Sequence, residues 1–196
     1  MIVQDWLYWG DKSDWGPQWD KTRYPDPAGM VSSLHQMGIK LFVSVWSCFS
    51  NHTRFYKTFK DQGFIFPQHN RYATTNYFYD AYDPAARDLF YHFVNESHFS
   101  IGVDGIWLDA TEPETNVFAD LPTYLGNGSE YLNGYVLGTT QAISDGFAVD
   151  APKKRVVSLT RSATPGSLRT GTLLWTGDTV EEKFLRPKGA KIFRVN

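Results

Sequence analysis

The sequence has little cysteine, no excess of basic residues and no long apolar run. Its 196 residues contain one cysteine, Cys48, which excludes an internal disulfide. The 19 Lys and Arg residues are balanced by 21 Asp and Glu residues, so charge gives no reason to expect binding to nucleic acid or to an anionic membrane surface. The run of about 18 apolar residues that a membrane span needs is missing. We therefore expect neither nucleic acid nor a membrane as a partner.

Motifs for phosphate, dinucleotide or metal binding are also missing. No Walker-type or dinucleotide glycine pattern occurs, and the five histidines do not have metal-ligand spacing. We expect no metal and no cofactor. The first ten residues have neither the basic start nor the apolar core of a signal peptide, and the cellular location is left open. Only three Asn-x-Ser/Thr sequons, at Asn51, Asn95 and Asn127, suggest secretion.

Aromatic residues, by contrast, are abundant: they make up 16% of the chain and include 7 Trp. Exposed Trp and Tyr rings in loops can stack against sugar rings, whereas most aromatic side chains fill a core. Composition alone leaves both interpretations open.

Short apolar runs alternate with amphipathic stretches along the chain. We expect strands over residues 1–9, 39–47, 102–109, 155–162 and 172–178. We expect helices over residues 26–38, 53–60, 83–99 and 130–146, and loops over 61–80 and 111–130. Apolar strands separated by helices are typical of a parallel sheet with helical cover. The pattern fits a closed (β/α) barrel or an open doubly wound sheet, and we favour the barrel.

Two aspartates stand out because each closes an apolar strand that contains a tryptophan. These are Asp109 and Asp178, and hydrolysis of a glycosidic bond needs two carboxyl groups in different environments. Arg161 also follows a strand, where it could bind sugar hydroxyls or keep a carboxylate ionised. The structural alternative is that Asp109 caps a turn and pairs with Arg161. The neighbouring acids Asp104, Glu112 and Glu114 are interpreted as loop, cap or surface residues.

Two long segments carry a family resemblance. "GVDGIWLDATEPE" (102–114) resembles the nucleophile segment of glycoside hydrolase family 31, and "LTRSATPGSLRTGTLLWTGD" (159–178) resembles the segment from a substrate-binding arginine to the acid/base aspartate. The stretches "QDWLYWGDKSDWG", "RYPDPAGMVSSLHQMGIKLFVSVW" and "YDAYDPAARDLFY" follow the family in the same order. The "WLDATEPE" form is closer to α-xylosidase-like members than to starch-type α-glucosidases.

The resemblance implies a (β/α)8 TIM barrel and hydrolysis of terminal α-xylosidic or α-glucosidic bonds with retention, without a metal or cofactor. Asp109 would be the nucleophile, exposed at its strand end, and Asp178 the general acid/base. Arg161 would bind the carbohydrate substrate with help from Asp5. The residues expected to line the same subsite are Trp46, Trp107 and Trp175.

The resemblance covers residues 1–180 as a partial catalytic domain, roughly barrel strands two to six. Residues 181–196, "EEKFLRPKGAKIFRVN", form a divergent basic tail that does not follow the family. An incomplete barrel would leave open strand edges, so the alternative is an inactive fragment or a sugar-binding remnant of such an enzyme. The sequence does not indicate an oligomeric state.

Overall fold

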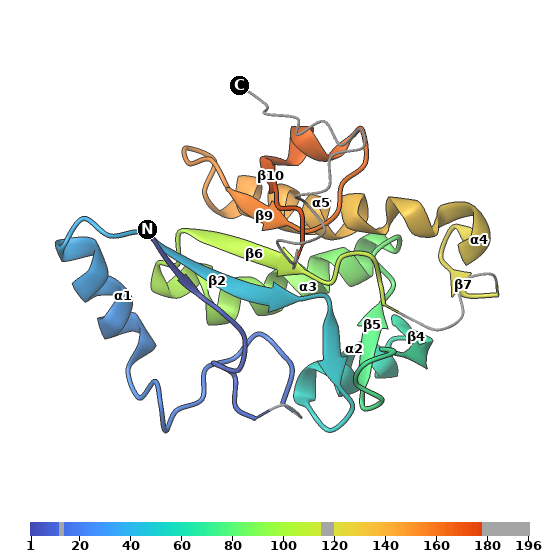
Figure 1. Ribbon diagram of the computed structural model, residues 1–196, viewed down its shortest axis with the longest axis horizontal. Coiled ribbons are helices and arrows are strands. Elements are labelled where there is room, and N and C mark those ends of the chain that lie inside the picture. The colour runs from blue at the N-terminus through green and yellow to red at the C-terminus, as the bar shows by residue number, and fades with distance from the viewer. Residues whose placement is uncertain (12–13, 115–119, 178–196) are drawn as a thin grey trace, which may run out of the picture.

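The computed structural model describes residues 1–11, 14–114 and 120–177. Its centre is a five-stranded parallel sheet with the strand order β1-β2-β6-β9-β10 (Figure 1). The strands are β1 (Ile2–Gln4), β2 (Leu41–Trp46), β6 (Gly105–Asp109), β9 (Ser158–Thr160) and β10 (Thr172–Leu174). Strands that follow one another in this set are therefore neighbours in space, as in an arc of a barrel.

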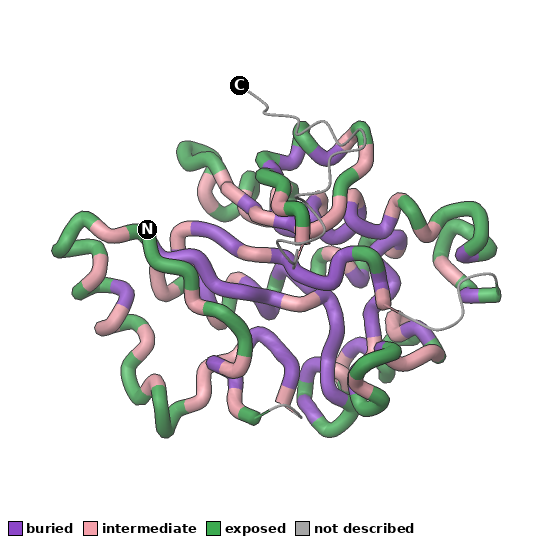
Figure 2. Tube along the Cα trace, in the orientation of Figure 1, coloured by how far each residue is buried: buried purple, intermediate pink, exposed green. Residues whose placement is uncertain are grey.

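The expected parallel sheet is confirmed, but the described strands do not close into a barrel. Strands β1 and β10 are the two edges of the sheet in this part of the chain. The physical reason is strand number, since the smallest interiors that side chains fill have about eight strands. Figure 2 shows the first two residues of β1 exposed, whereas β2 is mostly buried.

Three helices follow the expected pattern closely. Helix α1 (Pro27–Gln36) starts at Asp26, whose side chain accepts a hydrogen bond from the Gly29 N–H, and ends before Gly38, which has a positive φ of 72°. Helix α2 (Arg54–Asp61) is capped by Thr53. Helix α3 (Pro84–Ser97) is capped by Asp83 and has proline in its first turn.

The fourth expected helix is split into three pieces. A short helix α4 (Gly128–Tyr131) and a 3-10 turn (Leu132–Gly134) precede α5 (Tyr135–Asp150). Gly128 is the first residue of α4 and Gly134 is the last residue of the 3-10 turn, and glycine weakens a continuous helix. Helices α3 and α5 pack against each other behind the sheet (Figure 1). The part of the chain that the structure describes has no helix long and apolar enough to cross a membrane.

The expectation of loops over 61–80 and 111–130 is partly wrong, because both segments contain short strands. A second, antiparallel sheet has the order β3-β5-β4 and consists of β3 (Cys48–Ser50), β4 (Ile65–His69) and β5 (Asn76–Tyr79). Pro67 in β4 lacks an N–H, which argues against a central strand but is tolerated because β4 is an edge. A two-stranded hairpin, β7 (Pro122–Thr123) and β8 (Gly126–Asn127), lies in the second loop.

The core lies between the central sheet and the helices. Its sheet side includes Val43, Val45, Ile106 and Leu108, all at most 1% exposed. Side chains alternate between the two faces of a strand, so the intervening residues of β2 and β6 face the opposite side of the sheet. That opposite face carries the predicted site residues.

Candidate active site

Strand register places the predicted site residues in one row. Trp46 is paired with Asp109 across β2 and β6, and the β6–β9 register continues from Leu108 and Thr160 to Asp109 and Arg161. Partners in a parallel ladder point to the same face. The backbone N–H of Trp175 donates a hydrogen bond to the backbone carbonyl of Thr160 (3.0 Å). This contact extends the row to Trp175, the residue after β10.

Asp109 is the last residue of β6, as expected, but it is not exposed. Its residue surface is 9% accessible, so the expectation of an exposed carboxylate is wrong. Oδ1 accepts a hydrogen bond from the Ala110 N–H at 2.7 Å, and Ala110 has a left-handed φ of 53°. A non-glycine residue in this region costs about 1–2 kcal/mol. The turn that places the Ala110 N–H on Asp109 is therefore built at some cost to stability.

Burial changes the acidity of this carboxyl group. Desolvation is the largest effect and raises the pKa of Asp109 to about 6. The Arg161 guanidinium and the Ala110 N–H act in the opposite direction, while the negative charges of Glu114 and Glu112 add to the increase. With this pKa the carboxylate is about nine-tenths ionised at pH 7. Asp109 is thus anionic at neutral pH yet poorly solvated, which suits a nucleophile.

Arg161 contacts three carboxylates. Nη1 lies 3.3 Å from Asp109 Oδ1, and Nη2 donates to Glu112 Oε2 (2.9 Å) and to Glu114 Oε1. Burial disfavours the guanidinium charge, but the hydrogen bonds with Glu112 and the attraction of the acids raise the pKa of Arg161 further above its usual value. The pairing of Arg161 with Asp109 was the structural alternative from the sequence, and the structure contains that contact.

All of the predicted site residues that the structure describes line one cavity of about 610 Å³. They are Asp5, Trp46, Trp107, Asp109, Arg161 and Trp175. Asp178 and the tail 181–196 lie outside the described residues. Asp5 resembles Asp109 in its local geometry, because its Oδ1 also accepts the N–H of the next residue at 2.7 Å.

Tryptophan rings form the apolar walls. Trp107 and Trp175 meet edge to face with ring centroids 5.1 Å apart, and Trp46 packs edge to face on Trp15 at 4.3 Å. The indole nitrogens of Trp15, Trp46 and Trp107 are buried without a hydrogen-bond partner among the residues that the structure describes. Buried donors of this kind are normally satisfied, so these three unpaired N–H groups are unusual, and the cavity walls offer mainly apolar ring surface.

Sequence reasoning missed several residues of the cavity. The additional lining residues are Trp6, Trp15, Tyr72, Ala73 and Glu114. Trp6 lies two residues after the end of β1, so the strand-end rule could have included it, whereas Trp15 lies in the loop between β1 and α1 and carried no such signal. Tyr72 and Ala73 come from the turn between β4 and β5, which was expected to be a loop without a role in the site. Glu114 was interpreted as a loop or surface residue, but its side chain is only 18% exposed and contacts Arg161.

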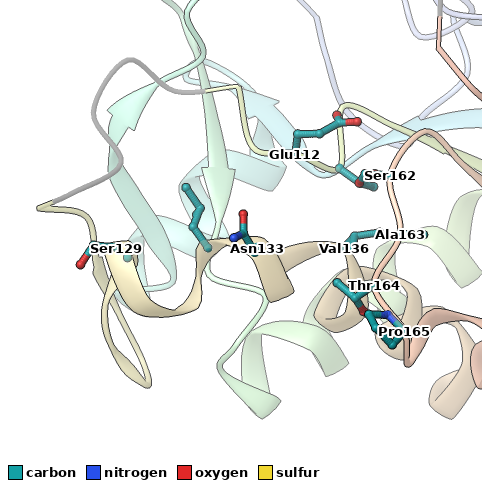
Figure 3. Close-up of a pocket in the computed structure, with 11 residues that line it drawn as sticks. Glu112, Ser129, Asn133, Val136, Ser162, Ala163, Thr164 and Pro165 are labelled. Carbon is teal, nitrogen blue, oxygen red and sulfur yellow. The ribbon is translucent and has the colours of Figure 1, made fainter. Parts of the chain in front are cut away.

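A second cavity, of about 680 Å³, is lined in part by Glu112 (Figure 3). It is bounded by the segment after β6, by α4 and α5, and by residues 162–165 after β9. The Thr111 hydroxyl bonds to the hydroxyls of Thr160 (2.8 Å) and Ser162 (2.7 Å) and so ties the first and last of these segments together. Glu112 lines this cavity while its carboxylate contacts Arg161, so the two cavities share one ion-pair network.

The model of the glycosyl hydrolases family 31 TIM-barrel domain matches residues 1–186. The chain therefore belongs to glycoside hydrolase family 31. The resemblance inferred from the two long segments is confirmed.

The relatives are mostly α-xylosidases. The alpha-xylosidase of Saccharolobus solfataricus is 37% identical over 188 residues, which are 92% of this chain and 24% of that protein. A family 31 glucosidase sequence of Pseudescherichia vulneris is 30% identical over 91% of this chain and 35% of its own length. The solved GH31 alpha-xylosidase from a soil metagenome, complexed with xylose, has a TM-score of 0.83 and 34% identity over 90% of this chain and 27% of that one. The chain thus spans about a quarter to a third of these relatives.

Proposed function

We propose that this protein is a retaining α-glycoside hydrolase that acts on terminal α-xylosidic bonds, with α-glucosidic bonds as the other substrate class. The observation that carries the proposal is the single cavity in which Asp109, Arg161, Asp5 and the tryptophans meet. The α-xylosidases among its relatives, one of them solved with xylose, support the choice of sugar.

In the proposed mechanism Asp109 is the nucleophile. Its contacts with Ala110 and Arg161 are both made through Oδ1, and we assign Oδ2 to attack on the anomeric carbon. As that bond forms, the bond to the leaving oxygen breaks and Asp178 donates a proton to this oxygen. In the second step Asp178 removes a proton from water, which attacks the anomeric carbon and releases Asp109 and the sugar with its α configuration retained.

The charges around the cavity suit this chemistry. Arg161 contributes one positive charge, whereas Asp5, Asp109 and Glu114 line the same cavity. The glycosyl group acquires positive charge in an oxocarbenium-like transition state, and fixed negative groups in a partly desolvated site stabilise such charge. We assign Arg161 and Asp5 to the sugar hydroxyls, and the tryptophan rings to its apolar faces.

A second candidate function is sugar binding without turnover. One observation favours it: among the described residues, the sheet that carries the site is open, and Val3 and Leu173 on its site-bearing face are 41% and 56% exposed. An open sheet holds the row of site residues less rigidly than a closed barrel. Both candidate functions predict that the chain binds the same sugar, but only the first predicts that it hydrolyses a glycoside.

The test is hydrolysis of p-nitrophenyl α-xyloside and p-nitrophenyl α-glucoside by the purified chain, beside Asp109→Asn. We expect faster release from the xyloside, α-xylose as the first product seen by proton NMR, and loss of turnover in Asp109→Asn with xylose binding retained. Binding of xylose without hydrolysis by the wild-type chain would support the second candidate. Near-wild-type rates in Asp109→Asn would show that the nucleophile is another residue.

A further inference from the structure

Glu114 connects the Arg161–Asp109 pair to a distant part of the chain. Its Oε1 accepts a hydrogen bond from Arg161 Nη2, and Arg161 Nη1 lies 3.3 Å from Asp109 Oδ1. The backbone carbonyl of Glu114 accepts a hydrogen bond of 2.7 Å from the backbone N–H of Arg71, which lies in the turn between β4 and β5. We propose that Glu114 is a positioning residue, which holds the Arg161 guanidinium in the orientation that keeps Nη1 on Asp109.

The turn that anchors Glu114 is itself well fixed. Asn70 is fully buried. Its side-chain Oδ1 accepts hydrogen bonds from the backbone N–H groups of Tyr72 (2.8 Å) and Ala73 (3.2 Å). Its backbone N–H donates to the backbone carbonyl of Asn76 (2.6 Å). A side-chain oxygen that accepts two successive backbone N–H groups fixes the turn around it. Glu114 is therefore attached at its backbone to a rigid element and at its side chain to Arg161.

Glu112 also contacts Arg161 and accepts hydrogen bonds from its Nε (3.1 and 3.2 Å) and Nη2 (2.9 Å), but its side chain lies at a more exposed position. Its side chain is 40% exposed, whereas that of Glu114 is 18% exposed. Water and salt screen charges at exposed positions and weaken their contribution. The negative charge of Glu114 accordingly affects Asp109 more strongly than that of Glu112 does. The difference between the effects of Glu114 and Glu112 on the pKa of Asp109 can be measured.

Five groups determine the electrostatic surroundings of Asp109. Arg161 faces it with a positive charge, Glu114 and Glu112 carry negative charges, Asp5 lines the same cavity, and the neutral Cys48 thiol is buried nearby. Glu114→Gln removes the negative charge but keeps a side-chain oxygen that can accept the hydrogen bond from Arg161 Nη2. The repulsion of the Asp109 carboxylate is therefore lost while the guanidinium keeps its orientation, and the ionised form of Asp109 is favoured.

The experiment titrates the Asp109 carboxyl carbon by NMR in the full chain, with its signal assigned by its loss in Asp109→Asn. We expect Glu114→Gln to lower the Asp109 pKa by about one unit, and Glu112→Gln to lower it by less. Glu96→Gln is the matched control, because Glu96 pairs with Arg54 at an exposed site away from the cavity, and it should leave the Asp109 titration unchanged. An unchanged Asp109 pKa in a folded Glu114→Gln chain would overturn the proposal.

A second variant covers the case in which Glu114→Gln does not fold. Glu114→Asp retains the charge but shortens the side chain by one methylene, so the contact with Nη2 is loosened. We expect restricted rotation of the guanidinium to give separate Arg161 Nη–H signals in the wild-type chain, and we expect this separation to be lost in Glu114→Asp. Retention of the same separate signals would contradict a positioning role.

The role in catalysis rests on the proposed function, but the titration does not. If the chain hydrolyses neither glycoside, the glycosidase proposal fails while the Asp109 titration still tests Glu114. If the chain is active, the acidic limb of kcat/KM against pH should move to lower pH in Glu114→Gln. A purely structural loop residue would change the unfolding temperature and leave that limb in place.

Discussion

Replacement of Asp109 by asparagine should make the folded chain more stable at neutral pH. The carboxyl has a pKa of about 6 in the folded state, against 3.8 for the model compound. This difference of about two units, at 1.36 kcal/mol per unit, corresponds to about 3 kcal/mol. Because the pKa is raised, the unfolded state loses the proton more readily, and ionisation of Asp109 favours unfolding.

The pH window follows from the same values. Between pH 3.8 and about 6 the folded chain retains the proton that the unfolded chain has released, so the stability contribution of Asp109 falls as pH rises and is constant above pH 6. The asparagine side chain does not ionise, so the variant lacks this pH-dependent contribution to stability. The difference in unfolding free energy, variant minus wild type, should therefore increase by about 3 kcal/mol from pH 3.5 to pH 7.

The assay is urea denaturation of both chains at several pH values, followed by fluorescence of the tryptophans. Asp88→Asn is the matched control, since Asp88 is exposed on α3, and it should change stability by no more than about 0.5 kcal/mol at any pH. A variant-minus-wild-type difference that stays constant across this range would refute the account of Asp109 burial. It would also remove the support that this burial gives to a nucleophile held in a desolvated site.

Two further predictions concern residues outside the cavity. His98 is fully buried with Nε2 3.0 Å from the Tyr8 hydroxyl, and burial lowers its pKa to about 3. The free energy of unfolding of the wild-type chain should therefore fall by up to about 1.4 kcal/mol per pH unit below pH 6.5. Urea titration should show that the His98→Gln variant lacks this pH-dependent loss. Asp104 accepts hydrogen bonds from the Leu41 N–H (3.0 Å) and Lys40 Nζ (2.8 Å), and although burial alone would raise its pKa, these contacts and His35 lower it. Asp104→Asn should therefore lose about 1.5 kcal/mol at pH 7, with the loss disappearing below pH 4; an equal loss at pH 3 would show that charge is not involved.

Much of the central sheet could be predicted from local sequence signals. The caps at Asp26 and Asp83, with a proline after each, define α1 and α3 because these signals act within a few residues. The apolar run before Asp109 predicts β6 for the same reason. Strand-end residues then share one cavity because parallel strands place their carboxyl ends at the same edge.

The remaining features depend on contacts between distant segments. The antiparallel sheet was not predicted, because Pro67 argues against a strand unless the strand is known to be an edge. Glu114 was not assigned to the site, because its partners Arg161 and Arg71 lie more than 40 positions away in the chain. The left-handed conformation of Ala110, directly after Asp109, was not predicted either, because alanine rarely adopts it and carries no sequence signal for it.

The cavity has walls of two structural origins, and this has a consequence for how its properties can change. Trp46, Asp109 and Arg161 lie on or directly after neighbouring strands, so the roughly 4.8 Å strand spacing and the ladder register determine their mutual positions. Tyr72 and Ala73 lie on the β4–β5 turn, whose length and sequence can vary without a shift of that register. Fit to the ligand can thus change without loss of reactivity at two positions: substitutions of the Tyr72 and Ala73 side chains can alter what enters the cavity, while the strand row, and the Arg71 backbone contact that holds Glu114, preserve the chemistry performed there.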